Sequence, residues 1–157
     1  MKILLSVWWD MHGIIHFELL GMNQTITAEV YCQQLQRLKT ALEQKRPALI
    51  NRKGVLFHQD NARPHTARMT SSKLEEFGWE KMPHPPYSPD IAPSDYHLFR
   101  SLQNHLVGKK LHSREAVKNE VASFFNSKPR EFFKRGIEKL VDRWKEVIDK
   151  EGNYIDD

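Results

Sequence analysis

The chain has 157 residues, of which 39% are hydrophobic and 28% charged, and it carries a formal net charge of +4. This length and composition fit one globular domain over residues 1–157. No run of about 18 apolar residues is present, so no membrane-spanning helix is expected. The single cysteine, Cys32, excludes an internal disulfide. The positive charge is modest evidence for an anionic partner such as nucleic acid.

The N-terminal part of the chain is predicted to begin with strands. Residues 2–10 are rich in Ile, Leu, Val and Trp, and a turn leads to a second apolar run at 14–20, which together predict a hairpin. A short third strand is expected around 24–27. The period then becomes helical over 27–45, with Thr27 as a plausible N-cap. The apolar face of this helix is expected to comprise Tyr31, Leu35, Leu38 and Leu42.

The middle of the chain continues the alternation of strands and helices. A fourth strand is predicted at 55–59, a helix at 65–77 that Gly78 ends, and a fifth strand at 79–82. Residues 83–93 contain five of the chain's eight prolines, which forbids helix and ladder strand through most of this segment. It is therefore predicted to be a loop.

The C-terminal part is predicted to be helical over 94–106, 113–127 and 130–150. A hairpin followed by alternating strands and helices indicates an α/β fold with a mixed sheet flanked by helices. In such a sheet the first and fourth strands can be neighbours. The expected core positions of the last helix are Phe133, Ile137, Leu140, Trp144 and Val147.

Three aspartates occupy positions where distant segments could bring them together. Asp10 ends the first predicted strand, Asp60 follows the fourth, and Asp95 lies in the first turn of the helix after the proline-rich loop. Clustered carboxylates repel one another unless a cation neutralises them, and oxygen ligands select Mg²⁺ or Mn²⁺. Two such ions can support phosphoryl transfer. The alternative, in which Asp60 and Asp95 are turn or N-cap residues, is about as well supported by position alone.

The residues around these acids resemble the signatures of mariner-family DNA transposases. The resembling segments are HQDNARPHTA at 58–67, PHPPYSPDIAPSDYHLF at 83–99, and VWWD at 7–10. Asp60 and Asp95 are separated by 34 residues, the spacing typical of this family, whereas related families end their triad in Glu. The resemblance covers essentially the whole chain.

The resemblance implies an RNase H-like fold with a mixed five-stranded sheet, as in retroviral integrases. It implies that Asp10, Asp60 and Asp95 are the catalytic triad and hold Mg²⁺ or Mn²⁺ in a two-metal site. The implied activity is cut-and-paste transposition in the nucleus: nicking at inverted-repeat DNA ends, then attack of the 3′-hydroxyl on target DNA. A homodimer is a further expected partner. Family members carry N-terminal helix-turn-helix modules, and this sequence begins at the first catalytic strand.

Two other functions stay open at this point. The chain can be a catalytically silent, transposon-derived module for DNA binding or dimerisation, or a generic RNase H-like ribonuclease. Asp90 competes with Asp95 for the third position, although its loop context favours a turn. The secondary candidates, each with an ordinary surface or turn role as the alternative, are Asn61, His58, His65, Arg63, Arg68, Lys109 and Lys110.

Overall fold

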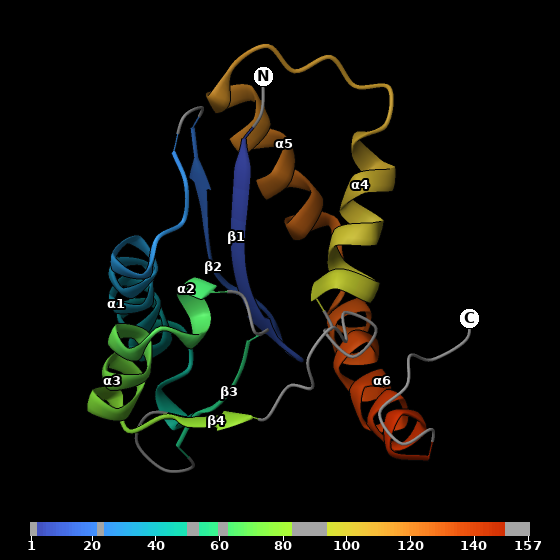
Figure 1. The fold of residues 1–157 in the computed structure, drawn as a ribbon. Helices are drawn as coiled ribbons and strands as arrows, with labels where there is room; N and C mark the ends of the chain where they lie inside the picture. The colour runs from blue at the N-terminus through green and yellow to red at the C-terminus, as the bar shows by residue number, and fades with distance from the viewer. Residues whose placement is uncertain (1–2, 22–23, 50–53, 60–62, 83–93, 150–157) are drawn as a thin grey trace. The chain divides into compact units, whose positions relative to one another are not determined.

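The computed structural model describes residues 3–21, 24–49, 54–59, 63–82 and 94–149 (Figure 1). Within these ranges, the side chains at 63, 82, 94–96 and 140–149 lie outside the description. The chain divides into two compact units, one formed by 1–23 with 88–157 and the other by 24–87. In the described part, no helix is long and apolar enough to cross a membrane.

The first unit begins with the predicted hairpin. Strands β1 (Leu4–Asp10) and β2 (Gly13–Leu20) pair antiparallel from Leu4 opposite Leu20 to Asp10 opposite Gly13. The register shifts between Trp8 and Trp9, because β2 contains one extra residue, Ile15, at this point. As a result Ile14, and not Ile15, packs with Trp9 against the helices of this unit. The bulge thus lies directly beside the end of β1 that carries Asp10.

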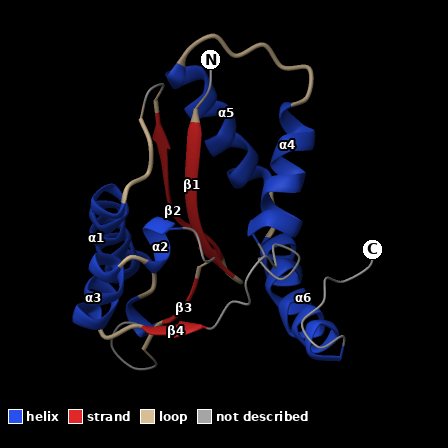
Figure 2. Cartoon of the chain, viewed as in Figure 1, coloured by secondary structure: helices blue, strands red, loops and turns tan. Residues whose placement is uncertain are grey.

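Helices cover one face of this hairpin (Figure 2). They are the π-helical segment η3 (Ser94–Phe99), α4 (Arg100–Leu106), α5 (Arg114–Ser127) and α6 (Arg130–Asp149). Alternate residues of β1 point toward them, since Leu5, Val7 and Trp9 pack against the buried cluster. The helices predicted over 94–106, 113–127 and 130–150 are confirmed, and the first of them begins as a π-helix. The buried cluster comprises Leu98, Leu102, Val121, Phe124, Phe125 and Phe133.

The second unit is built around helix α1 (Ala28–Lys45). The hydroxyl of Thr27 accepts a hydrogen bond from the Val30 N–H at 3.2 Å, which confirms the predicted N-cap. Strands β3 (Leu56–His58) and β4 (Glu80–Met82) pair in parallel, and the short helices α2 (Arg63–Thr66) and α3 (Arg68–Phe77) connect them. Gly78 ends α3 with a φ of 74°. The predicted apolar face of α1 is confirmed, because Tyr31, Leu35, Leu38 and Leu42 are all buried.

Four predictions about the elements need correction or stay open. The third strand was wrong: 24–27 form no strand, because extended Thr27 ends this segment by capping α1. The helix expected at 65–77 begins at Arg63 and is interrupted at Ala67. Strand pairing in the described residues is confined to β1 with β2 and β3 with β4, so the five-stranded sheet stays a prediction. The proline-rich segment 83–93 lies outside the described residues.

Candidate active site

Asp10 is the last residue of β1 and lies at the hairpin turn. Its Oδ1 accepts a hydrogen bond from the backbone N–H of His12 at 2.9 Å. A carboxylate that bonds the backbone two residues later closes a tight turn and is restricted in its rotamers. Asp10 is partly buried and lies beside the bulge in β2. The hydrogen bond to His12 therefore holds its carboxylate in a defined orientation there.

Asp95 is the second residue of η3, immediately before α4. Single turns of π-helix are rare and recur at functional sites. The Asp95 side chain lies outside the described residues, so its position is known only through the backbone and its neighbours. The first described side chain after Asp95 in the sequence is that of His97.

His97 joins the element of Asp95 to the strand of Asp10. Its ring lies against Trp9, the residue before Asp10, with centroids 6.3 Å apart and planes inclined by 22°. On another side, the centroids of the His97 and Phe132 rings are 4.3 Å apart. Nε2 of His97 donates to the Phe132 carbonyl at 2.6 Å. The strand and helix that carry the first and third predicted acids are therefore in contact through their neighbours.

The environment of His97 favours a neutral ring. Burial lowers the pKa of His97 below its ordinary value of 6.5, and the hydrogen bond to Phe132 partly opposes this effect. The positive charges of Lys139, Arg135 and Lys128 lower the pKa further. A neutral ring that donates from Nε2 fits a carbonyl acceptor, which has no proton to give.

Asp60 lies outside the described residues, but the residue before it, Gln59, is described. Gln59 is 6% exposed, and its side chain bridges two elements. Its Oε1 accepts from the Tyr31 hydroxyl at 2.8 Å, and its Nε2 donates to the His65 carbonyl at 2.8 Å. The centroids of the Tyr31 and His65 rings are also only 4.2 Å apart. Gln59 thus fixes the chain on both sides of Asp60.

The described side chains offer no competing metal site. Among them, no three His, Cys, Asp or Glu residues lie together in a way that could hold a metal ion. This finding leaves the predicted triad untested, because Asp60 and the side chain of Asp95 lie outside the described residues. The donor set itself fits the expected ions, since carboxylate oxygens are the ligands that Mg²⁺ and Mn²⁺ prefer.

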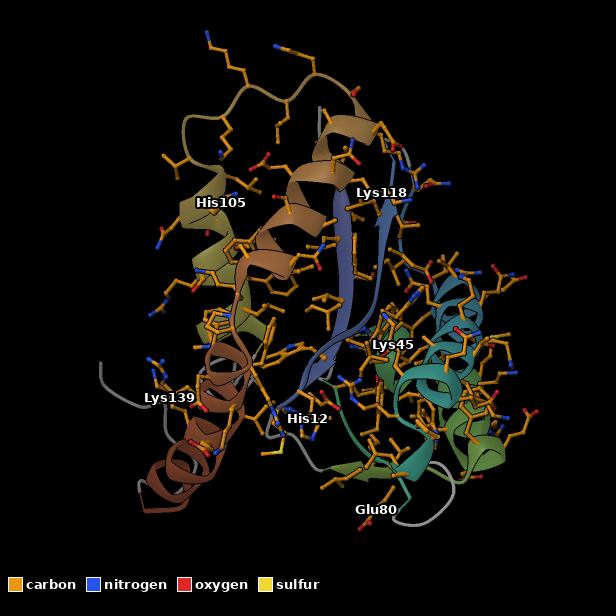
Figure 3. The ribbon with its side chains drawn as sticks, turned by 180° about the vertical axis from the view of Figure 1, so that it is seen from behind. His12, Lys45, Glu80, His105, Lys118 and Lys139 are labelled. Atoms are coloured by element: carbon orange, nitrogen blue, oxygen red, sulfur yellow. The ribbon has the colours of Figure 1, made fainter. Side chains whose placement is uncertain are left out.

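The basic residues proposed as DNA contacts have different surroundings. Lys109 lies 3.2 Å from the Glu120 carboxylate, which also lies 2.7 Å from Nε2 of His105. The charge of Lys109 is therefore partly compensated. Lys110 and Arg68 are exposed. Figure 3 shows His105 on α4, Lys118 on α5 and Lys139 on α6.

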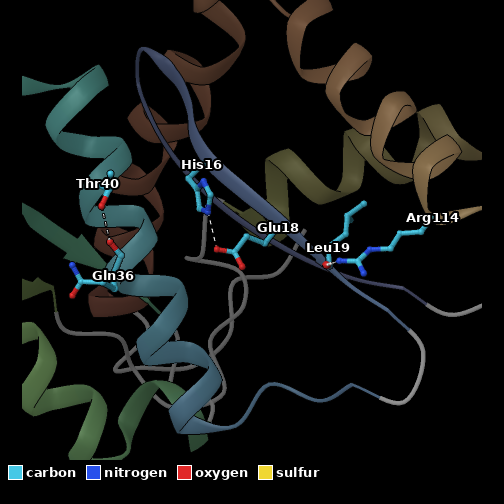
Figure 4. Close-up of polar contacts among 6 residues, drawn as sticks. All are labelled: His16, Glu18, Leu19, Gln36, Thr40 and Arg114. Atoms are coloured by element: carbon cyan, nitrogen blue, oxygen red, sulfur yellow. Dashed lines mark hydrogen bonds and ion pairs between the residues drawn. The ribbon is translucent and has the colours of Figure 1, made fainter.

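Several structural contacts had no signal in the sequence. The Arg114 guanidinium donates to the Leu19 carbonyl, and Nε2 of His16 lies 2.7 Å from Glu18 (Figure 4). His97 and Gln59 adjoin the motif acids, and this adjacency is the one sequence signal that could have indicated them. Tyr31, the partner of Gln59, and Phe132, the partner of His97, are 28 and 35 residues away in the sequence, and no local pattern identifies them.

Comparison with known proteins identifies the family. A family model for "Transposase (partial DDE domain)" matches residues 1–52. The chain is 41% identical over 155 residues to the Homo sapiens histone-lysine N-methyltransferase SETMAR, and 44% identical over 156 residues to the Drosophila mauritiana Mos1 transposase. The solved Mos1 catalytic domain with raltegravir and Mn matches 97% of this chain and 76% of that one, with 44% identity and a TM-score of 0.92. The chain belongs to the mariner transposases.

The match to mariner relatives extends along the chain but not along the relatives. It covers 99% of this chain in both curated relatives, yet the chain spans 23% of SETMAR and 45% of Mos1 transposase. The mixed α/β fold of the mariner catalytic domain is therefore shared.

Proposed function

We propose that this chain is the catalytic domain of a mariner-type DNA transposase, which nicks transposon ends and joins the freed 3′-hydroxyl to target DNA. The proposal includes the RNase H-like, five-stranded form of the α/β fold. The observation that carries it is the contact of Trp9 with His97, which ties the strand ending in Asp10 to the helix containing Asp95. Similarity to the Mos1 catalytic domain over 97% of the chain supports the same conclusion.

In this function Asp10, Asp60 and Asp95 would hold Mg²⁺ or Mn²⁺. The Mos1 catalytic domain was solved with each of these ions. The bound ions would supply an activated nucleophilic oxygen and stabilisation of the leaving oxygen. The chain contributes placement of the ligands. The His12 N–H restrains the Asp10 carboxylate, and Gln59 restrains the backbone that leads into Asp60.

The proposed partners are transposon-end DNA, target DNA and a second copy of the chain, in the nucleus. Mos1 transposase has been solved in paired-end complexes and in a strand transfer complex. The net charge of +4 is compatible with a polyanionic substrate.

Nicking of supercoiled plasmid DNA in the presence of Mn²⁺ tests this function. Asp60→Ala and Asp95→Asn are expected to lose at least about 100-fold in nicking rate, because each removes a metal ligand. The matched control is Asp90→Asn, which changes the acid five residues before Asp95 and is expected to keep wild-type activity. Circular dichroism spectra establish that the variants are folded.

The same assay separates this function from the alternative. A silent DNA-binding module would bind plasmid DNA in EDTA but would nick no DNA substrate with Mn²⁺. Equal nicking by Asp60→Ala and wild type would contradict the assignment of the triad.

A further inference from the structure

The strongest feature outside the acids is a close packing of Trp9, His97 and Gly136. Gly136 lies in α6, where alanine is normally the better helix former. A Cβ on Gly136 would contact Cδ2 of His97, lie 2.9 Å from Cγ of His97, and lie 2.9 Å from Cη2 of Trp9. Real Cβ atoms essentially never approach other heavy atoms this closely. The absence of a side chain at Gly136 thus permits the approach of three elements, β1, η3 and α6.

His97, in η3, occupies the centre of this packing and contacts both β1 and α6. Trp9 stacks on it from β1, and Phe132 lies against it from α6. Trp9 also packs against Phe133, with ring centroids 6.0 Å apart. The strand end is therefore held from two directions by α6 and η3.

Simple hydrophobic packing does not explain why this central residue is a histidine. A phenylalanine would supply the ring faces without any cost of burying a polar group. The histidine also fixes the rotation of its ring, because Nε2 must point at the Phe132 carbonyl, 2.6 Å away. A ring whose position and rotation are both fixed locates the backbone of η3 more sharply than apolar contact alone.

We propose that His97 is a positioning residue of the metal site, which sets the placement of Asp95 relative to Asp10 by bridging Trp9 and Phe132. This inference rests on the proposed function. Residues that orient metal ligands without touching the metal typically change metal affinity by about 10- to 100-fold when they are replaced. Gly136 contributes to the same positioning, because its lack of a side chain leaves the space that the His97 ring occupies.

Direct measurement of Mn²⁺ affinity tests the proposal without relying on catalysis. The dissociation constant of Mn²⁺ is obtained from the electron paramagnetic resonance signal of free Mn²⁺ over the full chain in the absence of DNA. His97→Phe keeps a ring beside Trp9 but loses the donor to Phe132, and it is expected to weaken Mn²⁺ binding by about tenfold or more. Gly136→Ala displaces the unaltered histidine and is expected to weaken binding similarly.

The matched control is His105→Phe, a second histidine of the same unit. His105 also contacts a phenylalanine ring, Phe124, at 5.1 Å, and a polar partner, Glu120. Its replacement is expected to lower the melting temperature but to leave the Mn²⁺ dissociation constant unchanged. A wild-type dissociation constant in folded His97→Phe would overturn the proposal. If His97→Phe does not fold, His97→Gln, which retains a donor near the Nε2 position and loses the stacking, decides by the same criterion.

Asp60→Ala distinguishes failure of this inference from failure of the proposed function. If Asp60→Ala loses Mn²⁺ binding while the folded His97 variants keep it, only the positioning role is wrong. If Asp60→Ala binds Mn²⁺ as well as wild type does, the metal site is wrong and the positioning role falls with it.

Discussion

At the scale of single residues, a buried polar side chain adjoins one of the predicted catalytic acids. Gln59, directly before Asp60, is one of the buried polar residues, and both ends of its amide are hydrogen-bonded. Such a residue is costly to place in a core unless its partners are correctly arranged. Its two bonds, to Tyr31 and to the His65 carbonyl, hold α1 and α2 at fixed distances from the end of β3.

Replacing Gln59 with leucine tests how much this bridge contributes. Leucine fills most of the volume but removes a hydrogen-bond partner from the Tyr31 hydroxyl and from the His65 carbonyl. Loss of a partner for a buried polar group costs about 1–3 kcal/mol, and we expect the free energy of unfolding to fall by this amount. Urea denaturation followed by circular dichroism measures it.

The matched control is Gln36→Leu, because Gln36 is exposed on α1. It is expected to change stability by less than about 0.5 kcal/mol, as most surface substitutions do. Equal stability of the Gln59 and Gln36 variants would show that the bridge contributes nothing.

At the scale of elements, a polar cluster joins α4 to α5. Glu120 of α5 accepts from His105 of α4 at 2.7 Å and pairs with Lys109, just beyond α4, at 3.2 Å. The His105 ring also packs on Phe124, so polar and apolar contacts act on the same side chain. The cluster is partly exposed to solvent, and its charges are therefore screened.

The pH dependence of stability reports on this cluster. The hydrogen bond from His105, and then that from Lys109, lower the pKa of Glu120 below its ordinary value of 4.5. The unfolded chain takes up this proton near the ordinary value, whereas the folded chain resists it to lower pH. The stabilisation is therefore complete above about pH 4.5 and is lost as the pH falls through the folded-state pKa.

Glu120→Gln is accordingly expected to have a melting temperature that falls less steeply than that of wild type below about pH 4.5. Thermal melts of both proteins across this range measure the difference. Because the cluster is partly exposed, about 1 M salt should bring the wild-type curve toward that of the variant. Parallel curves at low salt would count against a role for Glu120.

Sequence patterns predict the helices of this fold better than its strand pairing. The periodic face of α1 and the caps at Thr27 and Gly78 are local properties, and they occur as predicted. No local pattern indicates the bulge opposite Trp8 and Trp9, which places Ile14 with Trp9 against the helices. The break at Ala67 is spanned by a hydrogen bond from the Thr70 hydroxyl to the Pro64 carbonyl, a side-chain contact that helical periodicity does not indicate.

The candidate site shows the same division. Motif and spacing identify Asp10, Asp60 and Asp95 as candidates, and their assignment as metal ligands stays a prediction. The sequence could not indicate that Trp9 meets His97, or that Gly136 must lack a side chain, because these residues come from three separate elements. Supporting contacts of this kind depend on tertiary packing and become visible only in three dimensions.

At the scale of the whole molecule, positive charge gathers beside one of the proposed ligand segments. Lys128, Arg135 and Lys139 are close enough to His97 to lower its pKa by their charge. In α6, which carries Arg135 and Lys139, the Lys134 ammonium lies 3.8 Å from the Glu138 carboxylate. Among the described residues, no carboxylate lies within ion-pair distance of Arg135 or Lys139. We propose that an anionic partner contacts this part of α6, and DNA phosphate is the partner that the proposed function supplies.

The salt dependence of DNA binding tests this assignment. Each phosphate that a lysine or arginine neutralises releases counterions and makes the slope of log affinity against log salt concentration more negative by about 0.9. Removing one contact, in Lys139→Gln or Arg135→Gln, should reduce the magnitude of the slope by about one, uniformly across DNA sequences. Fluorescence anisotropy with labelled duplex DNA in EDTA measures binding without cleavage.

The control is Lys39→Gln, because Lys39 already lies 4.0 Å from Glu43 and over the Phe77 ring. The slope for this variant should equal that of wild type. An unchanged slope in both α6 variants would place the DNA elsewhere on the protein, whereas a reduced slope would assign this basic surface of α6 to the nucleic acid beside the proposed third ligand.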